Sequence, residues 1–247
     1  RSRILDRLAS KLLIDSDHRG SDFLVVSNRG KVRIMNRLPK EPSPDGAPFE
    51  EGDGNGNSLK KVSLSGMVLV ACPWVTDPAY NRSVFLIIEQ NENGTIGVVL
   101  NKPMALDPKP LLNFLFKGES ISEGSELGHF NFGGPNNGPI LAIHSESALA
   151  EGGNSQGVYL SAQVDTLRQL AEHSPEHLRW IIGHANWEKS QLEQEIIDGN
   201  WFVVPAVPEI VFEQEQSMWE KAIAWYGESI LSQFPGVRSL PASALCN

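Results

Sequence analysis

Two pairs of residues that contain histidine have the types and spacing that catalysis or metal binding would need. His144 and Ser145 follow the apolar run 140–143, which is typical of a strand, and polar groups at the end of a strand are often catalytic. Neighbouring side chains on a strand point to opposite faces, so this serine and histidine would not meet as nucleophile and base. We interpret His144 as a polar residue that is satisfied at a strand end, or as a ligand contact there.

The second pair, His173 and His177, has the i, i+4 spacing that places two metal ligands on one helix face. Pro175 lies between them and should end the helix, so both imidazoles are expected in solvent at a helix end. The sequence also lacks a nucleophile elbow, a P-loop and a dinucleotide-binding glycine motif. It therefore predicts no catalytic residues, no metal ion and no cofactor.

Three segments rich in glycine, proline or tryptophan are better candidates for a binding surface. In the first, residues 77–82, Asp77 precedes a proline and is a good turn initiator. Arg82 at its end has two interpretations, an ion pair with Asp77 or contact with an anionic ligand. In the second, Gly133-Gly134-Pro135, paired glycines permit positive φ and a close approach of backbone. That segment either holds a ligand or turns a tight corner.

The third segment, Gly183 to Trp187, is expected to join a strand that ends at Gly183 to a helix that begins near Ser190. A tryptophan in such a loop is a common ligand contact. The alternative is structural. Trp187 would then close over the core, while Ser190 and Glu193 form a capping box at the start of the helix.

The elements that must position these segments are short strands interspersed with helices. Apolar runs indicate strands at 66–71, 83–89, 95–100, 139–143, 158–160, 178–182 and 201–204. Periodic patterns indicate helices at 111–116, at 164–173, from 190 onward and at 213–231. Residues 91–94, Asn-Glu-Asn-Gly, indicate a type I′ hairpin turn, because Asn-Gly accepts positive φ. Hairpins mixed with helices predict an α+β fold rather than a strictly parallel winding.

Composition divides the chain into four parts. Residues 1–38 are a basic extension, in which 2–14 has the pattern of an amphipathic helix and 23–26 that of a strand. Residues 39–64 are rich in proline, glycine and acidic side chains, which is typical of a flexible linker. The folded domain is expected at 65–232, followed by a C-terminal tail at 233–247.

Charge is distributed unevenly along the 247 residues, whose formal net charge is −9. Residues 1–40 carry ten basic and four acidic side chains, which gives +6, and residues 41–64 carry −3, which leaves −12 on the rest. Nucleic-acid binding depends mainly on neutralising phosphates. Any nucleic-acid contact is therefore expected through the basic arm 1–40 and not through residues 65–247.

The same composition bears on the compartment. No apolar run reaches the ~18 residues of a membrane-spanning helix, and the first residues are not followed by a signal-peptide core. Two cysteines, Cys72 and Cys246, are too few and too far apart for a disulfide framework. We expect a cytoplasmic protein without membrane contact.

The candidate segments occur in an order that resembles the YqgE/AlgH family. The resemblance covers about residues 65–232, and its motifs are Gly66 to Pro73, Asp77-Pro78, Arg82-Ser83-Val84, Glu89, Gly94, Gly97, Asn101-Lys102-Pro103, Gly133-Gly134-Pro135, His144-Ser145, Gly183 to Trp187, Gln191-Leu192-Glu193, Glu195 and Trp201. Each motif is short, and their number and order make the resemblance specific. Four positions depart from it: Gln90, His184, Asn186 and Ser190 stand where the family usually has His, Tyr, Gly and Gly.

The resemblance implies an α+β fold with a bifurcated, partly barrel-like mixed sheet surrounded by helices, to which this chain would add an N-terminal helical arm. It implies no settled activity, because most members are uncharacterised and some have been called transcriptional regulators. We therefore expect a non-enzymatic cytoplasmic regulatory or binding protein with an unknown protein or small-molecule partner. The alternatives are a hydrolase-like enzyme with a pocket at the glycine-rich loops, and a transcriptional regulator that uses the basic arm.

The expected binding residues come from the three segments and from the family motifs. They are Asp77, Arg82, Asn101, Gly133, Gly134, Pro135, His144, Gly183, Trp187, Gln191 and Glu193.

Overall fold

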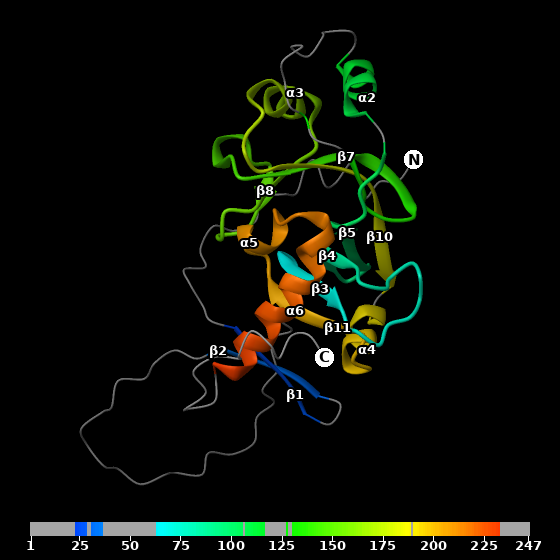
Figure 1. Ribbon diagram of the computed structural model, residues 1–247, viewed down its shortest axis with the longest axis vertical. Coiled ribbons are helices and arrows are strands. Elements are labelled where there is room, and N and C mark those ends of the chain that lie inside the picture. The colour runs from blue at the N-terminus through cyan, green and yellow to red at the C-terminus, as the bar shows by residue number, and fades with distance from the viewer. Residues whose placement is uncertain are drawn as a thin grey trace, which may run out of the picture.

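The computed structural model describes residues 23–28, 31–36, 63–105, 107–116, 127, 130–188 and 190–232 (Figure 1). The first two ranges form an antiparallel hairpin of β1 (Phe23–Asn28) and β2 (Lys31–Asn36), of which only the backbone is described. The strand predicted at 23–26 is thereby confirmed. The helix expected at 2–14, the tail at 233–247 and nearly all of the linker lie outside the described residues.

The other described strands form one sheet. They are β3 (Met67–Ala71), β4 (Val84–Asn91), β5 (Gly94–Val99), β6 (Phe130–Phe132), β7 (Asn136–His144), β8 (Gly152–Gly153), β9 (Tyr159–Ser161), β10 (Leu178–Glu188) and β11 (Trp201–Pro205). Their order is β11-β3-β4-β5-β10-β7-β9-β8, and β6 pairs with β10 outside this path. Every neighbouring pair is antiparallel except β6 with β10, so the sheet is mixed.

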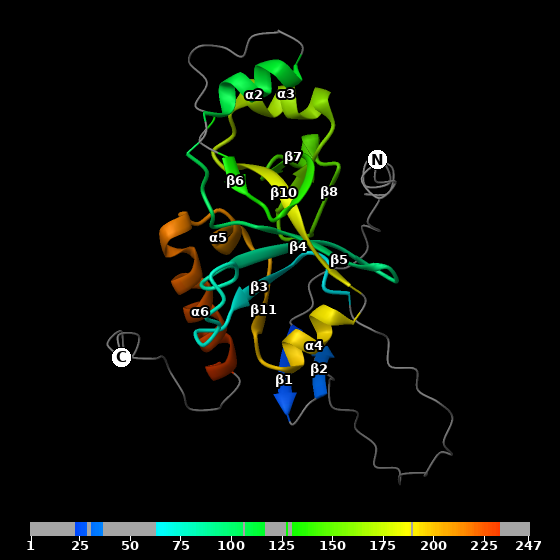
Figure 2. The same ribbon diagram turned by 90° about the vertical axis from the view of Figure 1, so that its right-hand side faces the viewer.

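Strand β10 is where the sheet divides. Its second half, Ala185 to Glu188, pairs with β5, while its first half lies between β7 and β6. The two branches separate around Gly183, where the register with β7 shifts by a bulge. The curled sheet and its fork confirm the bifurcated, partly barrel-like α+β architecture (Figure 2).

The helices cover different parts of this sheet. They are α2 (Pro108–Leu115), the 3-10 turn η1 (Ser147–Leu149), α3 (Val164–His173), α4 (Gln191–Ile197), α5 (Pro208–Val211) and α6 (Glu215–Leu231). Helices α2 and α3 lie together over the β6–β7 branch, whereas α5 and α6 lie along the other branch and α4 lies at its far end (Figure 2). Among the described residues no helix is both long and apolar enough to cross a bilayer.

Strand β3 shows why the sheet needs helices on both faces. Val68 and Val70 point into a core shared with Met218 and Ala222 of α6. Leu69 and Ala71 point to the opposite face, into a second core that includes Leu192 and Ile196 of α4. Alternate side chains of a strand point to opposite faces, so a strand buried on both sides is apolar throughout. A third core joins α2 and α3 to Phe130 and Trp180.

Two local expectations are refined by the structure. The hairpin at 91–94 is confirmed, but its turn is not type I′, because Asn91 pairs with Gly94 and neither Glu92 nor Asn93 has positive φ. The Asn91 side chain stabilises the turn by accepting the N–H of Asn93 at 2.8 Å. Leu64, assigned by composition to the linker, is buried in the core beside α4.

Candidate functional site

The loop between β3 and β4 begins as its sequence predicts. Asp77 Oδ1 accepts the N–H of Ala79 at 2.8 Å, and the Asp77 carbonyl accepts the N–H groups of Tyr80 and Asn81. Asp77 is thus the turn initiator. The expected ion pair of Asp77 with Arg82 is wrong, because the Arg82 guanidinium reaches Glu220 of α6 at 2.7 Å. It lies 4.6 Å above the ring of Trp219, a cation–π contact.

The backbone of Arg82 is strained, and a predicted site residue holds it. Arg82 has φ +52°, a left-handed conformation that residues with a side chain rarely adopt. Asn101, just after β5, donates from Nδ2 to the Arg82 carbonyl at 2.8 Å and accepts the N–H of Val84 at 3.0 Å. The structure therefore brings Arg82 and Asn101 together. Strain of this kind is found mostly at functional sites, and it persists only where the surroundings fix it.

The same loop presents a tryptophan that the sequence reasoning missed. Trp74 is 61% exposed, yet its indole N–H donates to the Gly199 carbonyl at 3.1 Å. Its ring meets the edge of Phe202, and Phe202 stacks on Tyr226 of α6 with ring centroids 4.2 Å apart. A large apolar ring is thus held rigidly in solvent.

Helix α6 connects the tryptophan and the arginine. Trp219 and Tyr226 are seven residues apart and so lie on one face of the helix. The first underlies Arg82, and the second supports Trp74 through Phe202. The Trp219 indole is itself fixed by donating to the Ala71 carbonyl at 2.7 Å. We call Trp74, Arg82, Trp219 and Glu220 the β3–β4 loop surface.

The two glycine-rich segments meet each other. A Cβ on Gly133 would lie 2.3 Å from the Gly183 carbonyl oxygen, and one on Gly134 would lie 2.3 Å from the carbonyl carbon of His184. Gly134 and Gly183 both have positive φ. The close backbone approach predicted for the paired glycines is present, and β10 makes it. The assignment of Gly133, Gly134, Pro135 and Gly183 to ligand binding stays a prediction.

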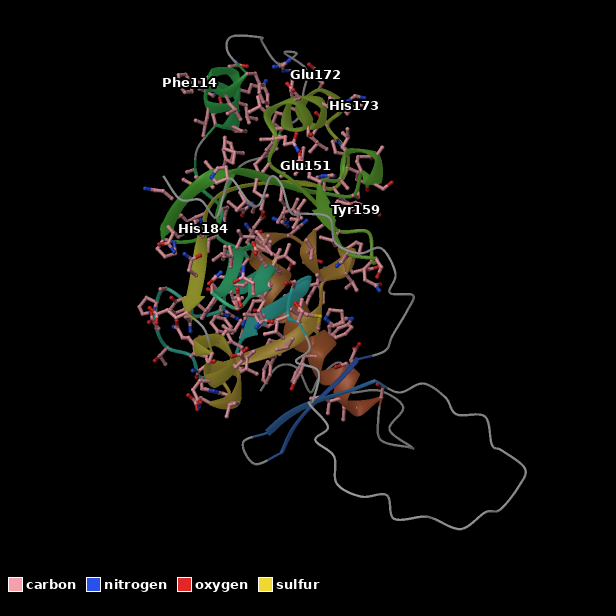
Figure 3. All side chains as sticks on the ribbon, turned by 180° about the vertical axis from the view of Figure 1, so that it is seen from behind. Phe114, Glu151, Tyr159, Glu172, His173 and His184 are labelled. Carbon is pink, nitrogen blue, oxygen red and sulfur yellow. The ribbon has the colours of Figure 1, made fainter. Side chains whose placement is uncertain are left out.

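The segment Gly183 to Trp187 is not a loop. It is the continuation of β10, which runs to Glu188, so the strand end expected at Gly183 is wrong. The bulge at Gly183 lets β10 leave β7 and pair with β5. A glycine inside an apolar run is equally compatible with the end of a strand and with a bulge inside a longer strand. Only the pairing with distant strands decides between the two. His184, at the bulge, pairs with Asn136 of β7 and lies at the outer side of the molecule (Figure 3).

Trp187 belongs to a buried aromatic cluster. Its ring meets Phe85 at 5.3 Å, and its indole N–H donates to Glu195 at 3.1 Å. The same Glu195 oxygen, Oε2, accepts the indole N–H of Trp201 at 2.8 Å, while Oε1 accepts the amide of Gln191 at 2.9 Å. Sequence reasoning did not select Glu195 for this role. Trp187 therefore packs in the core, as the structural alternative expected.

The capping box expected at α4 does not form. Ser190 has φ +66° and makes no side-chain bond to the helix, whereas a capping box needs an extended residue at that position. Left-handed φ favours glycine, which the family resemblance places there. Glu193 instead accepts from the Gln90 amide at 3.3 Å, and Gln90 also accepts the N–H of Leu64.

His144 is buried, and its partner is distant in sequence. Its Nε2 lies 2.9 Å from Ser161 Oγ on β9, and its Nδ1 accepts the N–H of Glu146 at 3.2 Å. The Ser161 hydroxyl donates to the Leu149 carbonyl at 2.6 Å, so Nε2 must carry the proton that His144 shares with Ser161. A neutral imidazole in this tautomer cannot take a proton from Ser161. His144 is therefore a polar residue whose two ring nitrogens are both hydrogen-bonded at a strand end, as the structural interpretation expected.

The pair predicts a pH dependence of stability. Burial lowers the pKa of His144 from 6.5 to about 4, against a smaller opposing effect of Glu151, which lies close to β8 and Tyr159 (Figure 3). Between those pH values the unfolded chain binds a proton that the folded chain does not, so stability falls as the pH drops from about 6.5 to about 4. When the pH is lowered from 7.5 to 5, the free energy of unfolding of His144→Gln should fall by roughly 2 kcal/mol less than that of wild type. Urea unfolding at the two pH values measures the difference.

The His144→Gln comparison also controls for other groups. Burial lowers the pKa of His184 too, so His184 adds to the acid sensitivity of both proteins equally. Equal losses in the two proteins would show that His144 is not the buried neutral group described.

The predicted site residues thus fall into separate places. Arg82 and Asn101 meet at the β3–β4 loop, the glycines meet at the fork in β10, and Trp187 and Gln191 meet at Glu195. Arg82, His144 and Glu193 contact Glu220, Ser161 and Gln90, respectively. In the described part of the chain no group of three or more His, Cys, Asp or Glu could hold a metal ion.

Comparison with known proteins agrees with the fold. Residues 68–230 match the model of a family described as AlgH-like. A UPF0301 protein of Pseudoalteromonas translucida is 30% identical over 179 residues, which cover 70% of this chain and 96% of the relative. A UPF0301 protein of Proteus mirabilis is 32% identical over 177 residues, which cover 68% of this chain and 95% of the relative. The names of these relatives assign no activity.

Solved structures are similar as well. The solution structure of AlgH from Pseudomonas aeruginosa has a TM-score of 0.55 and 26% identity, covering 72% of this chain and 99% of that one. A crystal structure of a Corynebacterium diphtheriae protein, at 24% identity and a TM-score of 0.52, shares the fold.

Proposed function

The chain belongs to the AlgH-like family, and we propose that it is a non-enzymatic binding protein that docks a protein partner on its β3–β4 loop surface. The observation that carries this proposal is that the loop between β3 and β4 presents both the exposed, hydrogen-bonded Trp74 and the strained Arg82. Tryptophan and arginine dominate the energetic centres of protein interfaces.

Preorganisation favours this role over a purely structural one. The Trp74 ring is fixed by Gly199 and Phe202, and the Arg82 guanidinium is fixed by Glu220 and Trp219. A partner would therefore order few side chains on binding, which lowers the entropic cost of association. We propose that the partner offers an apolar pocket for the Trp74 ring.

Two reactive groups of the described chain are arranged for structure rather than for catalysis. Ser161 cannot be activated by His144, because Nε2 of that imidazole already carries the proton. Cys72 is buried, and burial raises the pKa of its thiol to about 12, which keeps it protonated at neutral pH. These features support a binding protein over the hydrolase-like alternative.

The compartment and the class of partner are part of the proposal. We propose the cytoplasm, since two distant cysteines give the chain no disulfide framework that an oxidising compartment would favour. The charge of −12 on residues 65–247 supports a protein rather than a nucleic acid as the partner of this domain.

The test compares two exposed aromatic residues. Full-length wild type, Trp74→Ala and Phe114→Ala are used as baits in a lysate of the source organism, with isotope labelling to quantify what each retains. Phe114 is 83% exposed and projects outward from α2, at the other end of the molecule from α6 (Figure 3). We expect a protein that wild type and Phe114→Ala retain equally and that Trp74→Ala retains at least about tenfold less.

Two outcomes would contradict the proposal. One is that Trp74→Ala retains the same proteins as wild type in the same amounts. The other is that the two alanine variants lose the same proteins equally, which would indicate general stickiness of exposed aromatic rings. The melting temperatures of the three baits should agree closely, because Trp74 and Phe114 are both exposed.

A further inference from the structure

An open cavity of about 190 Å³ lies where β10 begins. Its walls come from the connection between α3 and β10, from strand β6 and from the junction of α5 and α6. The lining residues are Asn131, Glu176, His177, Leu178, Arg179, Phe212, Gln214 and Glu215. Three separate segments thus converge on it.

One wall of the cavity holds an unsatisfied polar atom. Asn131 is 1% exposed, and its side-chain oxygen Oδ1 has no hydrogen-bond partner among the described residues. Its backbone is fixed in β6, opposite Ile181 of β10 and beside Pro103. A buried amide oxygen without a donor is costly, and native proteins rarely keep one without a reason. Within the described residues this oxygen is therefore left to accept a hydrogen bond from whatever occupies the cavity.

The guanidinium in the cavity wall is already satisfied by the protein. Arg179 donates from Nε to the Val211 carbonyl at 2.8 Å and from Nη1 to the Leu100 carbonyl at 3.4 Å. It also donates to the Glu213 carbonyl and forms a buried ion pair with Glu215. Its charge is thus neutralised within the protein, and an anionic ligand would find little attraction here.

The remaining lining is acidic and apolar. The Glu176 carboxylate lies exposed on the rim, and Leu178 provides apolar surface. His177 and Phe212 stack with ring centroids 4.9 Å apart and an interplanar angle of 7°, which makes a flat wall. A buried amide oxygen, an exposed carboxylate and apolar surface in one lining fit a short alkyl chain that ends in a positively charged donor.

We propose that this cavity binds an aliphatic ammonium group, with Asn131 accepting one of its N–H bonds and Glu176 supplying the opposite charge. A volume of this size accommodates a molecule of about six non-hydrogen atoms. The ammonium can belong to a small free amine or to a lysine side chain of a peptide, since both present the same chemistry. The inference does not depend on the proposed function, because none of its residues belongs to the β3–β4 loop surface.

Calorimetric titration of the full-length protein tests this site. The ligands are 1,4-diaminobutane, the uncharged butane-1,4-diol and Nα-acetyl-lysine amide. We expect the diamine to bind with a dissociation constant of about 1 mM or tighter, and the diol at least about tenfold more weakly. Binding of the lysine amide as well would identify a basic peptide as the source, and binding of the diamine alone would identify a free amine.

Matched variants connect the binding to the cavity. Glu176→Gln should weaken binding of the diamine about threefold, whereas Glu172→Gln, an exposed substitution on α3, should not change it. Asn131→Leu should abolish binding. If that variant does not fold, the side-chain amide resonances of Asn131 in wild type provide the readout, and they should shift when the diamine is added.

Three results would overturn the proposal. The first is no binding of any amine up to about 10 mM. The second is equal binding of the diamine and the diol. The third is an equal effect of Glu176→Gln and Glu172→Gln, which would show only diffuse attraction to an acidic protein.

Discussion

Arg179→Met is expected to lower the free energy of unfolding by about 3–5 kcal/mol. Arg179 is 7% exposed, and its guanidinium serves three backbone carbonyls and the carboxylate of Glu215. Methionine fills much of the same volume but donates nothing. It would leave a buried carboxylate and several carbonyls without their donor, and urea unfolding at neutral pH measures the loss.

Arg82→Met is the matched control. Arg82 also pairs with a carboxylate of α6, but both side chains are more than half exposed. An ion pair in solvent contributes about 0–1 kcal/mol, so this variant should remain close to wild type. The double variant Arg179→Met with Glu215→Leu should recover part of the loss, because it removes the uncompensated charge. A loss under about 1 kcal/mol for Arg179→Met would contradict the buried network.

Gly134→Ala is expected to destabilise the fold by roughly 3 kcal/mol, or to prevent folding. Its Cβ would lie 2.3 Å from one backbone atom of β10 and 2.5 Å from two others, and its φ is +149°. Backbone cannot yield as a flexible side chain can, so the β6–β7 connection would have to move away from the fork in β10.

The same substitution at Gly227 should stabilise the fold instead of destabilising it. Gly227 lies inside α6, and nothing lies within 4 Å of the position of its Cβ. Alanine is the better helix former by about 1 kcal/mol, so Gly227→Ala should raise the melting temperature. If both variants changed stability by the same amount and sign, the close approach at Gly134 would be refuted.

Much of the fold was predictable from local pattern. The hairpin at 91–94, the helix after Val164 and the long C-terminal helix depend on neighbours in sequence, and all three are present. The family order of the motifs predicted the forked sheet, which no single segment specifies. The full length of β10 was not predicted, because its bulge depends on pairing with β5 and β7.

The candidate site was less predictable, because its partners are distant in sequence. Arg82 could be paired with nearby Asp77 by proximity along the chain, yet it meets Glu220, 138 residues away. His144 was selected with its neighbour Ser145, while its partner is Ser161 on another strand. Trp74 and Asn131 carry no local motif, and only their surroundings in the fold distinguish them.

The most direct test of the protein-binding proposal is the affinity of the captured partner for three versions of the chain. Once purified, the partner is titrated calorimetrically into wild type, Trp74→Ala and Phe114→Ala. We predict a dissociation constant at least about tenfold higher for Trp74→Ala, since a central interface tryptophan contributes well over 1 kcal/mol, and an unchanged constant for Phe114→Ala. Equal affinity of the partner for wild type and Trp74→Ala would contradict the assignment of the β3–β4 loop surface as the binding site.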